Sequence, residues 1–84
     1  MIVELTAAAE ADLEAIGDYI AQDNPARALS FVRELSRSCL ELVDMPEAWP
    51  IVPPYEHHGV RRRVYGRYLI FYRVAVSRIT ILHV

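Results

Sequence analysis

The chain has 84 residues, of which 54% are hydrophobic and 24% charged, and its formal net charge is −2. This length allows one domain with a compact core, and no apolar run approaches the roughly 20 residues that a membrane-spanning helix requires. The single cysteine, Cys39, excludes an internal disulfide, and the acidic N-terminal stretch differs from a secretory signal, so we expect a cytoplasmic protein without a membrane partner.

The charges are divided along the chain. Residues 1–56 contain all eleven Asp and Glu residues and three Arg, whereas residues 57–84 contain six Arg and no acid. Two interpretations of this division are open. Either the acidic part neutralises the basic part within one fold, or the basic part binds an anionic partner.

The first predicted elements are a short strand at residues 2–5 and an amphipathic helix from Ala7 to about Gln22. Thr6 is suited to cap this helix. Apolar residues recur every three or four positions, which predicts one buried stripe of Ala9, Leu13, Ile16 and Ile20. Gly17 weakens the helix by about 1 kcal/mol relative to alanine, and close packing against a neighbouring element would explain it.

A second helix is predicted from Pro25 to about Asp44. Asn24 is a favoured cap, proline is favoured at the first helical position, and Pro46 follows the predicted end. Its predicted buried stripe consists of Ala28, Val32, Leu35, Cys39 and Leu42. Because the link between the two helices is short, we expect an antiparallel hairpin.

Residues 46–58 contain four of the five prolines and are predicted to form a structured loop. Three strand-like runs follow, at residues 60–65, 68–74 and 78–84. The predicted fold class is α+β in the order β-α-α-β-β-β. A helical hairpin would pack on one face of a small, mainly antiparallel sheet.

The segment GVRRRVYGRYLIFYRV, residues 59–74, contains five of the nine arginines. Side chains two apart on a strand share a face. If the turn between its two strands has an even number of residues, Arg61 and Arg63 share a face with Tyr68, Ile70 and Tyr72; an odd number reverses this. In either register arginine lies beside tyrosine on at least one face, which suits the binding of carboxylates or phosphates.

Two segments in this order and spacing resemble the RelE/ParE superfamily of bacterial toxins, which are also called plasmid-stabilisation proteins. They are the helix junction YIAQDNPARA and the arginine-rich GVRRRVYGRYLIFYRV, which is followed near the C-terminus by ITILHV. The resemblance covers essentially the whole chain. It implies a single RelE/ParE-like toxin domain over residues 1–84.

The resemblance implies two alternative activities. RelE-like members cleave ribosome-bound mRNA, whereas ParE-like members poison DNA gyrase without a ribonuclease site. This chain has no lysine, and Leu69 stands where RelE-like ribonucleases carry an arginine. The groups left for a ribonuclease site are Arg61, Arg62, Arg63, Tyr68 and His83, among which the general base is weak. We therefore expect a ParE-like gyrase poison rather than an enzyme, without catalytic residues, cofactor or metal.

The resemblance also implies a cognate antitoxin, whose acidic segment would fold along the basic sheet and an apolar helix groove. The candidate residues for contact with the antitoxin or the target are Arg61, Arg63, Arg67, Tyr68, Tyr72 and Arg73. A free sheet edge is a further candidate, because it can accept an added strand. The alternatives are a ribosome and mRNA partner, or a small nucleic-acid-binding domain in which tyrosines stack on bases.

Members of the superfamily continue past the last strand with a short tail that is implicated in gyrase poisoning. The sequence stops at Val84, so we expect a chain that binds its antitoxin and poisons gyrase weakly. Of the other residues, His57 and His58 are expected to be solvated rather than metal ligands. Trp49 is expected to pack on the core, and Cys39 to act as a small buried hydrophobe.

Overall fold

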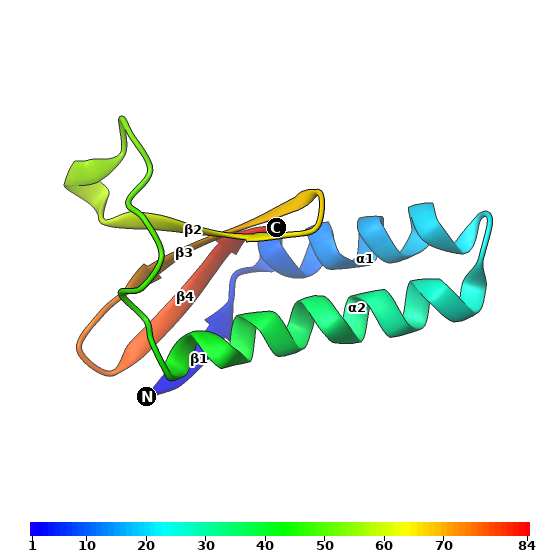
Figure 1. Ribbon diagram of the computed structural model, residues 1–84, viewed down its shortest axis with the longest axis horizontal. Helices are drawn as coiled ribbons and strands as arrows, with labels where there is room; N and C mark the ends of the chain where they lie inside the picture. Colours follow the sequence, from blue (N-terminus) through cyan, green and yellow to red (C-terminus); the bar gives the residue numbers. More distant parts are fainter.

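The computed structural model describes all 84 residues and shows a four-stranded sheet with two helices on one side (Figure 1). The elements in chain order are β1 (Ile2–Leu5), α1 (Ala7–Ala21), α2 (Pro25–Leu40), 3₁₀ turns at Glu41–Val43 and Glu56–His58, β2 (Val60–Tyr65), β3 (Tyr68–Val74) and β4 (Arg78–His83). The strand order is β1-β4-β3-β2, in which β1 is parallel to β4 and the other neighbours are antiparallel. The predicted α+β fold is confirmed.

Both helices begin at their predicted caps. The Thr6 side chain accepts a hydrogen bond from the Ala9 N–H at 3.1 Å, and the Asn24 side chain accepts one from the Arg27 N–H at 3.0 Å. The Thr6 hydroxyl also donates to the Leu82 carbonyl at 3.0 Å, which joins the start of α1 to β4. The second helix ends earlier than predicted, because the chain tightens into a 3₁₀ turn after Leu40. Neither helix is long and apolar enough to cross a membrane.

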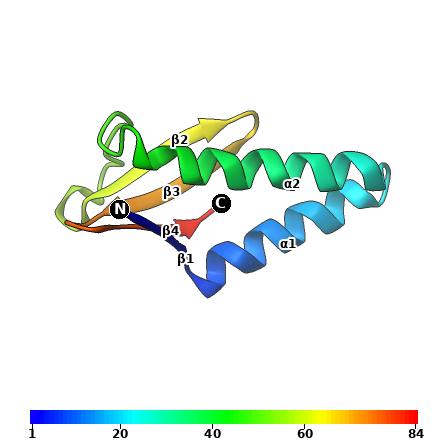
Figure 2. The same ribbon diagram turned by 90° about the horizontal axis from the view of Figure 1, so that it is seen from below.

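The two helices lie side by side as an antiparallel hairpin (Figure 2). Close packing between the helices explains why α1 has a glycine at position 17. A Cβ atom added at Gly17 would lie 3.2 Å from Cγ2 of Val32 on α2, which is tighter than an ordinary contact. The hairpin therefore uses the small residue for close helix packing.

The core lies between the hairpin and the sheet face that it covers. The predicted helical stripes are buried there, with Ile20 and Val32 only partly so. The residues that leave less than 2% of their surface exposed are Ala9, Leu35, Cys39, Leu42, Ile70, Tyr72, Ile79 and Ile81. Each fully buried Leu or Ile contributes about 1.5–3 kcal/mol relative to an exposed one. Trp49 packs against this core, as expected. Burial raises the pKa of the Cys39 thiol to about 11, so the thiol stays protonated and packs as a small hydrophobic group.

A two-residue turn sets the register of the arginine-rich hairpin. Tyr65 is paired with Tyr68, so only Gly66 and Arg67 lie between the strands. Gly66 adopts a φ of 58°, a left-handed conformation that glycine accepts without strain. Of the two registers that the sequence left open, the structure has the one with an even turn.

Candidate functional site

The alternation of β2 and β3 divides the arginine-rich segment between two faces of the sheet. The inner face, which faces the helices, carries Arg61 and Arg63 of β2 opposite Tyr72 and Ile70 of β3. The outer face has no helix over it (Figures 1 and 2). The outer-face residues of these two strands are Val60, Arg62, Val64, Leu69, Phe71 and Arg73.

Two inner-face side chains attach the proline-rich loop to the sheet. Arg61 donates from one guanidinium nitrogen to the Glu47 carbonyl at 3.1 Å and to the Trp49 carbonyl at 2.7 Å. The Tyr72 hydroxyl donates to the Pro46 carbonyl at 2.8 Å, and Tyr72 leaves no surface exposed. Burial raises the pKa of the Tyr72 hydroxyl. Both residues were predicted to contact a partner, and both hold the fold together in this structure.

Arg63 is also engaged within the molecule. It donates to the Ser38 carbonyl of α2 at 2.8 Å, forms an ion pair with Glu41 at 3.2 Å and lies 5.0 Å from the centre of the Trp49 ring. Only 18% of its side chain is exposed. The predicted contact residue Arg63 therefore joins β2 to α2, and its Nε–H lies buried without a partner.

The tip of the hairpin is attached to α2 through aromatic side chains. The Tyr65 hydroxyl donates to Glu34 at 2.6 Å, and hydrogen bonds from Arg27 and then Tyr65 lower the pKa of Glu34. The Phe31 ring lies 5.5 Å from the ring of Tyr68, between centroids. Tyr68, another predicted contact residue, is consequently only partly exposed.

Three arginines of the β2–β3 hairpin have no partner within the chain. The side chains of Arg62, Arg67 and Arg73 are exposed and form no ion pair or hydrogen bond. Two other sheet arginines are neutralised internally, as Arg63 pairs with Glu41 and Arg78 with Glu4. Part of the basic charge is thus compensated within the fold, and part is free on the outer face and at the hairpin turn.

The outer face contains an apolar hollow of about 340 Å³, lined by Tyr55, Val60, Phe71, Leu82 and His83. Two of the free arginines, Arg62 and Arg73, lie beside it. Across the β2–β3 pair, Arg62 is opposite Phe71 and Arg73 is opposite Val60. A bulge in the β3–β4 pairing shifts the register between Phe71 and Tyr72, next to Leu82. The predicted contacts with the antitoxin or the target did not include Arg62, Phe71 or Leu82, although an even turn places the first two on one face.

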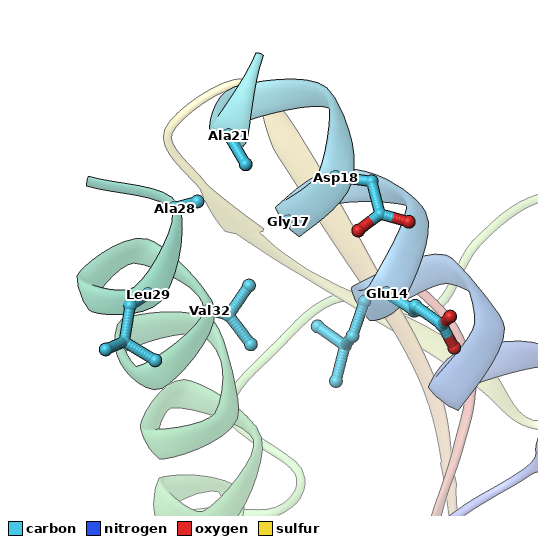
Figure 3. Close-up of a pocket in the computed structure, with 8 residues that line it drawn as sticks. Glu14, Gly17, Asp18, Ala21, Ala28, Leu29 and Val32 are labelled. Carbon is cyan, nitrogen blue, oxygen red and sulfur yellow. The ribbon is translucent and has the colours of Figure 1, made fainter. Parts of the chain in front are cut away.

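A second hollow, of about 350 Å³, lies between the helices of the hairpin (Figure 3). Small and apolar residues of both helices form most of it, and two acids of α1 lie on its wall. Its lining consists of Leu13, Glu14, Gly17, Asp18, Ala21, Ala28, Leu29 and Val32. This helix cleft differs from the outer face in the sign of its charge.

The sheet edge at β2 is partly closed by the proline-rich loop. The Val52 N–H donates to the Val60 carbonyl at 2.8 Å, and the Arg62 N–H donates to the Pro50 carbonyl at 3.1 Å. Ile51 forms a bridge with Arg61. This half of the β2 edge is therefore not free for an added strand, whereas β1 forms the other edge of the sheet.

The end of β4 is held by an acid of α1. One carboxylate oxygen of Asp12 lies 2.8 Å from Nδ1 of His83 and accepts a hydrogen bond from the Val84 N–H at 3.0 Å. The Val84 N–H, and then His83, lower the pKa of Asp12. His57 and His58 are exposed, and no group of three or more His, Cys, Asp or Glu side chains is placed to hold a metal ion.

Comparisons with known proteins identify the family. The family described as the ParE toxin of the type II toxin–antitoxin system parDE matches residues 3–84. A solved structure, the chromosomal ParDE toxin–antitoxin system from P. aeruginosa, is similar to this chain with a TM-score of 0.80 and 28% identity, over 99% of this chain and 91% of that one. A search of curated proteins found no match. The resemblance to ParE-like toxins is confirmed, and the chain belongs to the ParE toxin family of type II toxin–antitoxin systems.

Proposed function

We propose that this ParE-type toxin inhibits DNA gyrase and that a cognate antitoxin neutralises it by binding the outer face of the sheet and the helix cleft. The observation that carries the proposal is the set of exposed, unpaired arginines in the β2–β3 hairpin of a chain of this family. They are Arg62 and Arg73, which lie opposite apolar residues, and Arg67 in the turn. Such a surface suits an acidic protein segment that also has apolar side chains.

The predicted contact residues have different roles in this proposal. Arg67 and Arg73 are exposed and would contact the antitoxin directly, and Tyr68 would offer the exposed part of its ring. The other three would support the binding surface without touching the antitoxin, because they hold the loop and α2 against the sheet. They are Arg61, Arg63 and Tyr72.

The arrangement of polar groups favours a protein target over RNA cleavage. Metal-independent RNA cleavage requires a general base and groups that stabilise the charged phosphate in the transition state. Arg61 and Arg63 donate to carbonyl groups of the chain, and the His83 ring lies against Asp12. The outer face, on the other side of the sheet from Arg61 and Arg63, carries arginines among apolar residues such as Leu69, which suits protein docking.

The test begins with co-expression of the toxin and the protein encoded by the adjacent reading frame. After purification of the complex and release of the toxin, gyrase supercoiling and ribosome-dependent mRNA cleavage would be assayed in parallel. We expect inhibition of supercoiling in proportion to toxin concentration, reversed by the antitoxin, with mRNA left intact. Selective loss of mRNA without an effect on gyrase would contradict the proposal.

A further inference from the structure

We propose that the hollow of the outer face is an anchor site for one large apolar side chain on an acidic segment of the antitoxin. The inference rests on the proposed function, because it takes the antitoxin as the occupant. It goes further by naming the anchor, the pocket and the charges that surround it.

The pairing of β2 with β3 places apolar and cationic residues at alternate corners of one square. Arg62 is opposite Phe71, and two residues away Arg73 is opposite Val60. Phe71 and Val60 line the hollow, which the remaining wall residues close from the loop and β4. A side chain that enters the hollow is therefore flanked by a guanidinium from each strand.

The charge of this face selects an acidic segment. Arg62 and Arg73 have no intramolecular partner, so a carboxylate that approaches them need not displace an existing ion pair. Charge-assisted pairs between guanidinium and carboxylate are strong and can be bidentate. An acidic segment would gain such pairs on both sides of the anchor.

The size and lining of the hollow select an apolar anchor. Its volume of about 340 Å³ is lined by four aromatic or aliphatic side chains and by His83. This is at the lower end of the range for ligand pockets, roughly 300–1,000 Å³. In many protein interfaces a few residues in well-packed pockets carry most of the affinity, and Trp, Tyr and Arg are the commonest among them.

The helix cleft does not compete for the same segment. Its wall carries the carboxylates of Glu14 and Asp18, which Figure 3 shows on the α1 side of the cleft. Like charges across an interface disfavour binding. An acidic segment is therefore directed to the outer face, and whatever covers the cleft must carry less negative charge.

The first arm of the test uses a synthetic probe. A fluorescein-labelled acidic amphipathic peptide with one tryptophan would be titrated with the toxin, beside a matched peptide with alanine in place of tryptophan. We expect the Arg62→Glu/Arg73→Glu variant and the Phe71→Ser variant each to weaken binding at least about tenfold. Arg33→Glu/Arg37→Glu, at two exposed arginines of α2, reverses the same number of charges as the double variant and should remain within about twofold.

Comparison of the tryptophan and alanine peptides shows whether the tryptophan side chain binds in the hollow. Replacing it by alanine should weaken binding to the native toxin but have little further effect on Phe71→Ser, since the pocket is already lost there. If Phe71→Ser fails to fold, the exposed arginine variant and Phe71→Leu still decide the question. Equal binding of the two peptides to the native toxin would overturn the anchor.

The second arm uses the antitoxin from the adjacent reading frame and a single-stranded RNA oligonucleotide. If the antitoxin binds but neither variant changes its affinity, the inference fails while the proposed function stands. If no complex forms, the proposed function fails and the peptide arm alone decides the pocket. Binding of the RNA, but not of the acidic peptide, to the native toxin would overturn the inference in favour of a nucleic-acid surface.

Discussion

The two faces of the sheet use the same residue type for different purposes. Arg61 and Arg63 on the inner face donate to backbone carbonyls and hold the loop and α2 in place. Arg62, between them in sequence, points to the other side and has no partner in the chain. Of the three consecutive arginines, two therefore stabilise the fold and one is available to a partner. The alternation of a single strand, rather than the total charge, decides which arginines are available to a partner.

The largest expected effect compares neighbours on β2. Arg63→Ala should lower the free energy of unfolding by about 2–3 kcal/mol, because it removes charge-assisted hydrogen bonds and leaves the buried Ser38 carbonyl without its donor. Arg62→Ala should change it by less than about 0.5 kcal/mol. Urea denaturation followed by circular dichroism measures both. If both variants lost the same free energy of unfolding, Arg62 and Arg63 would not differ in their contribution to the fold.

A smaller effect is expected for the hydroxyl that holds the loop. Tyr72→Phe removes the donor to the Pro46 carbonyl and should cost about 1 kcal/mol. Tyr55→Phe is the matched control, because Tyr55 is 53% exposed and its hydroxyl forms no hydrogen bond within the chain. It should leave the urea midpoint nearly unchanged. If Tyr72→Phe is as stable as the control, the loop is held by Arg61 and packing alone.

A third prediction concerns antitoxin binding rather than folding. Arg67 lies in the exposed turn and Arg78 is paired with Glu4, so the same mutation to alanine should weaken antitoxin binding more at Arg67. We expect the dissociation constant of the antitoxin complex to rise about threefold to tenfold in Arg67→Ala and to rise less in Arg78→Ala. Titration calorimetry with the purified antitoxin compares them. A larger loss for Arg78→Ala would mean that unpaired charge does not mark the contact surface.

The smallest effect is a dependence on pH. Hydrogen bonds from the Val84 N–H and from His83 lower the pKa of Asp12 below its usual 3.8. The unfolded chain then binds a proton more readily at this site, so the stabilisation is present above about pH 4 and is lost as pH falls through the lower pKa of the folded state. Asp12→Asn should flatten the loss of stability that accompanies a fall in pH below about 4. Glu14→Gln, an exposed acid of the same helix, should leave the curve unchanged.

The elements and the buried stripes could be predicted from the sequence because they depend on local signals. Thr6, Asn24 and Pro25 mark the helix starts, and the apolar spacing marks the covered side. The register was left open, since one residue more or less in the turn at Gly66 exchanges the two faces.

The contacts of the inner-face arginines could not be predicted in the same way. Their acceptors are mostly backbone carbonyls, at Ser38, Glu47 and Trp49, and every residue type carries a carbonyl. Nor does the sequence show that Asp12 holds the backbone of Val84, 72 residues away. Such long-range bonds decide which members of a charged segment remain at the surface.

The most direct test of the two-face account is methyl cross-saturation in the complex of isotope-labelled toxin with unlabelled antitoxin. Saturation of the antitoxin should transfer to the methyl groups of Val60, Leu69 and Leu82 on the outer face and leave those of Ile70, Ile79 and Ile81 unaffected. Transfer confined to Leu29 and Val32 of the helix cleft, with none at Leu69 or Leu82, would contradict the account.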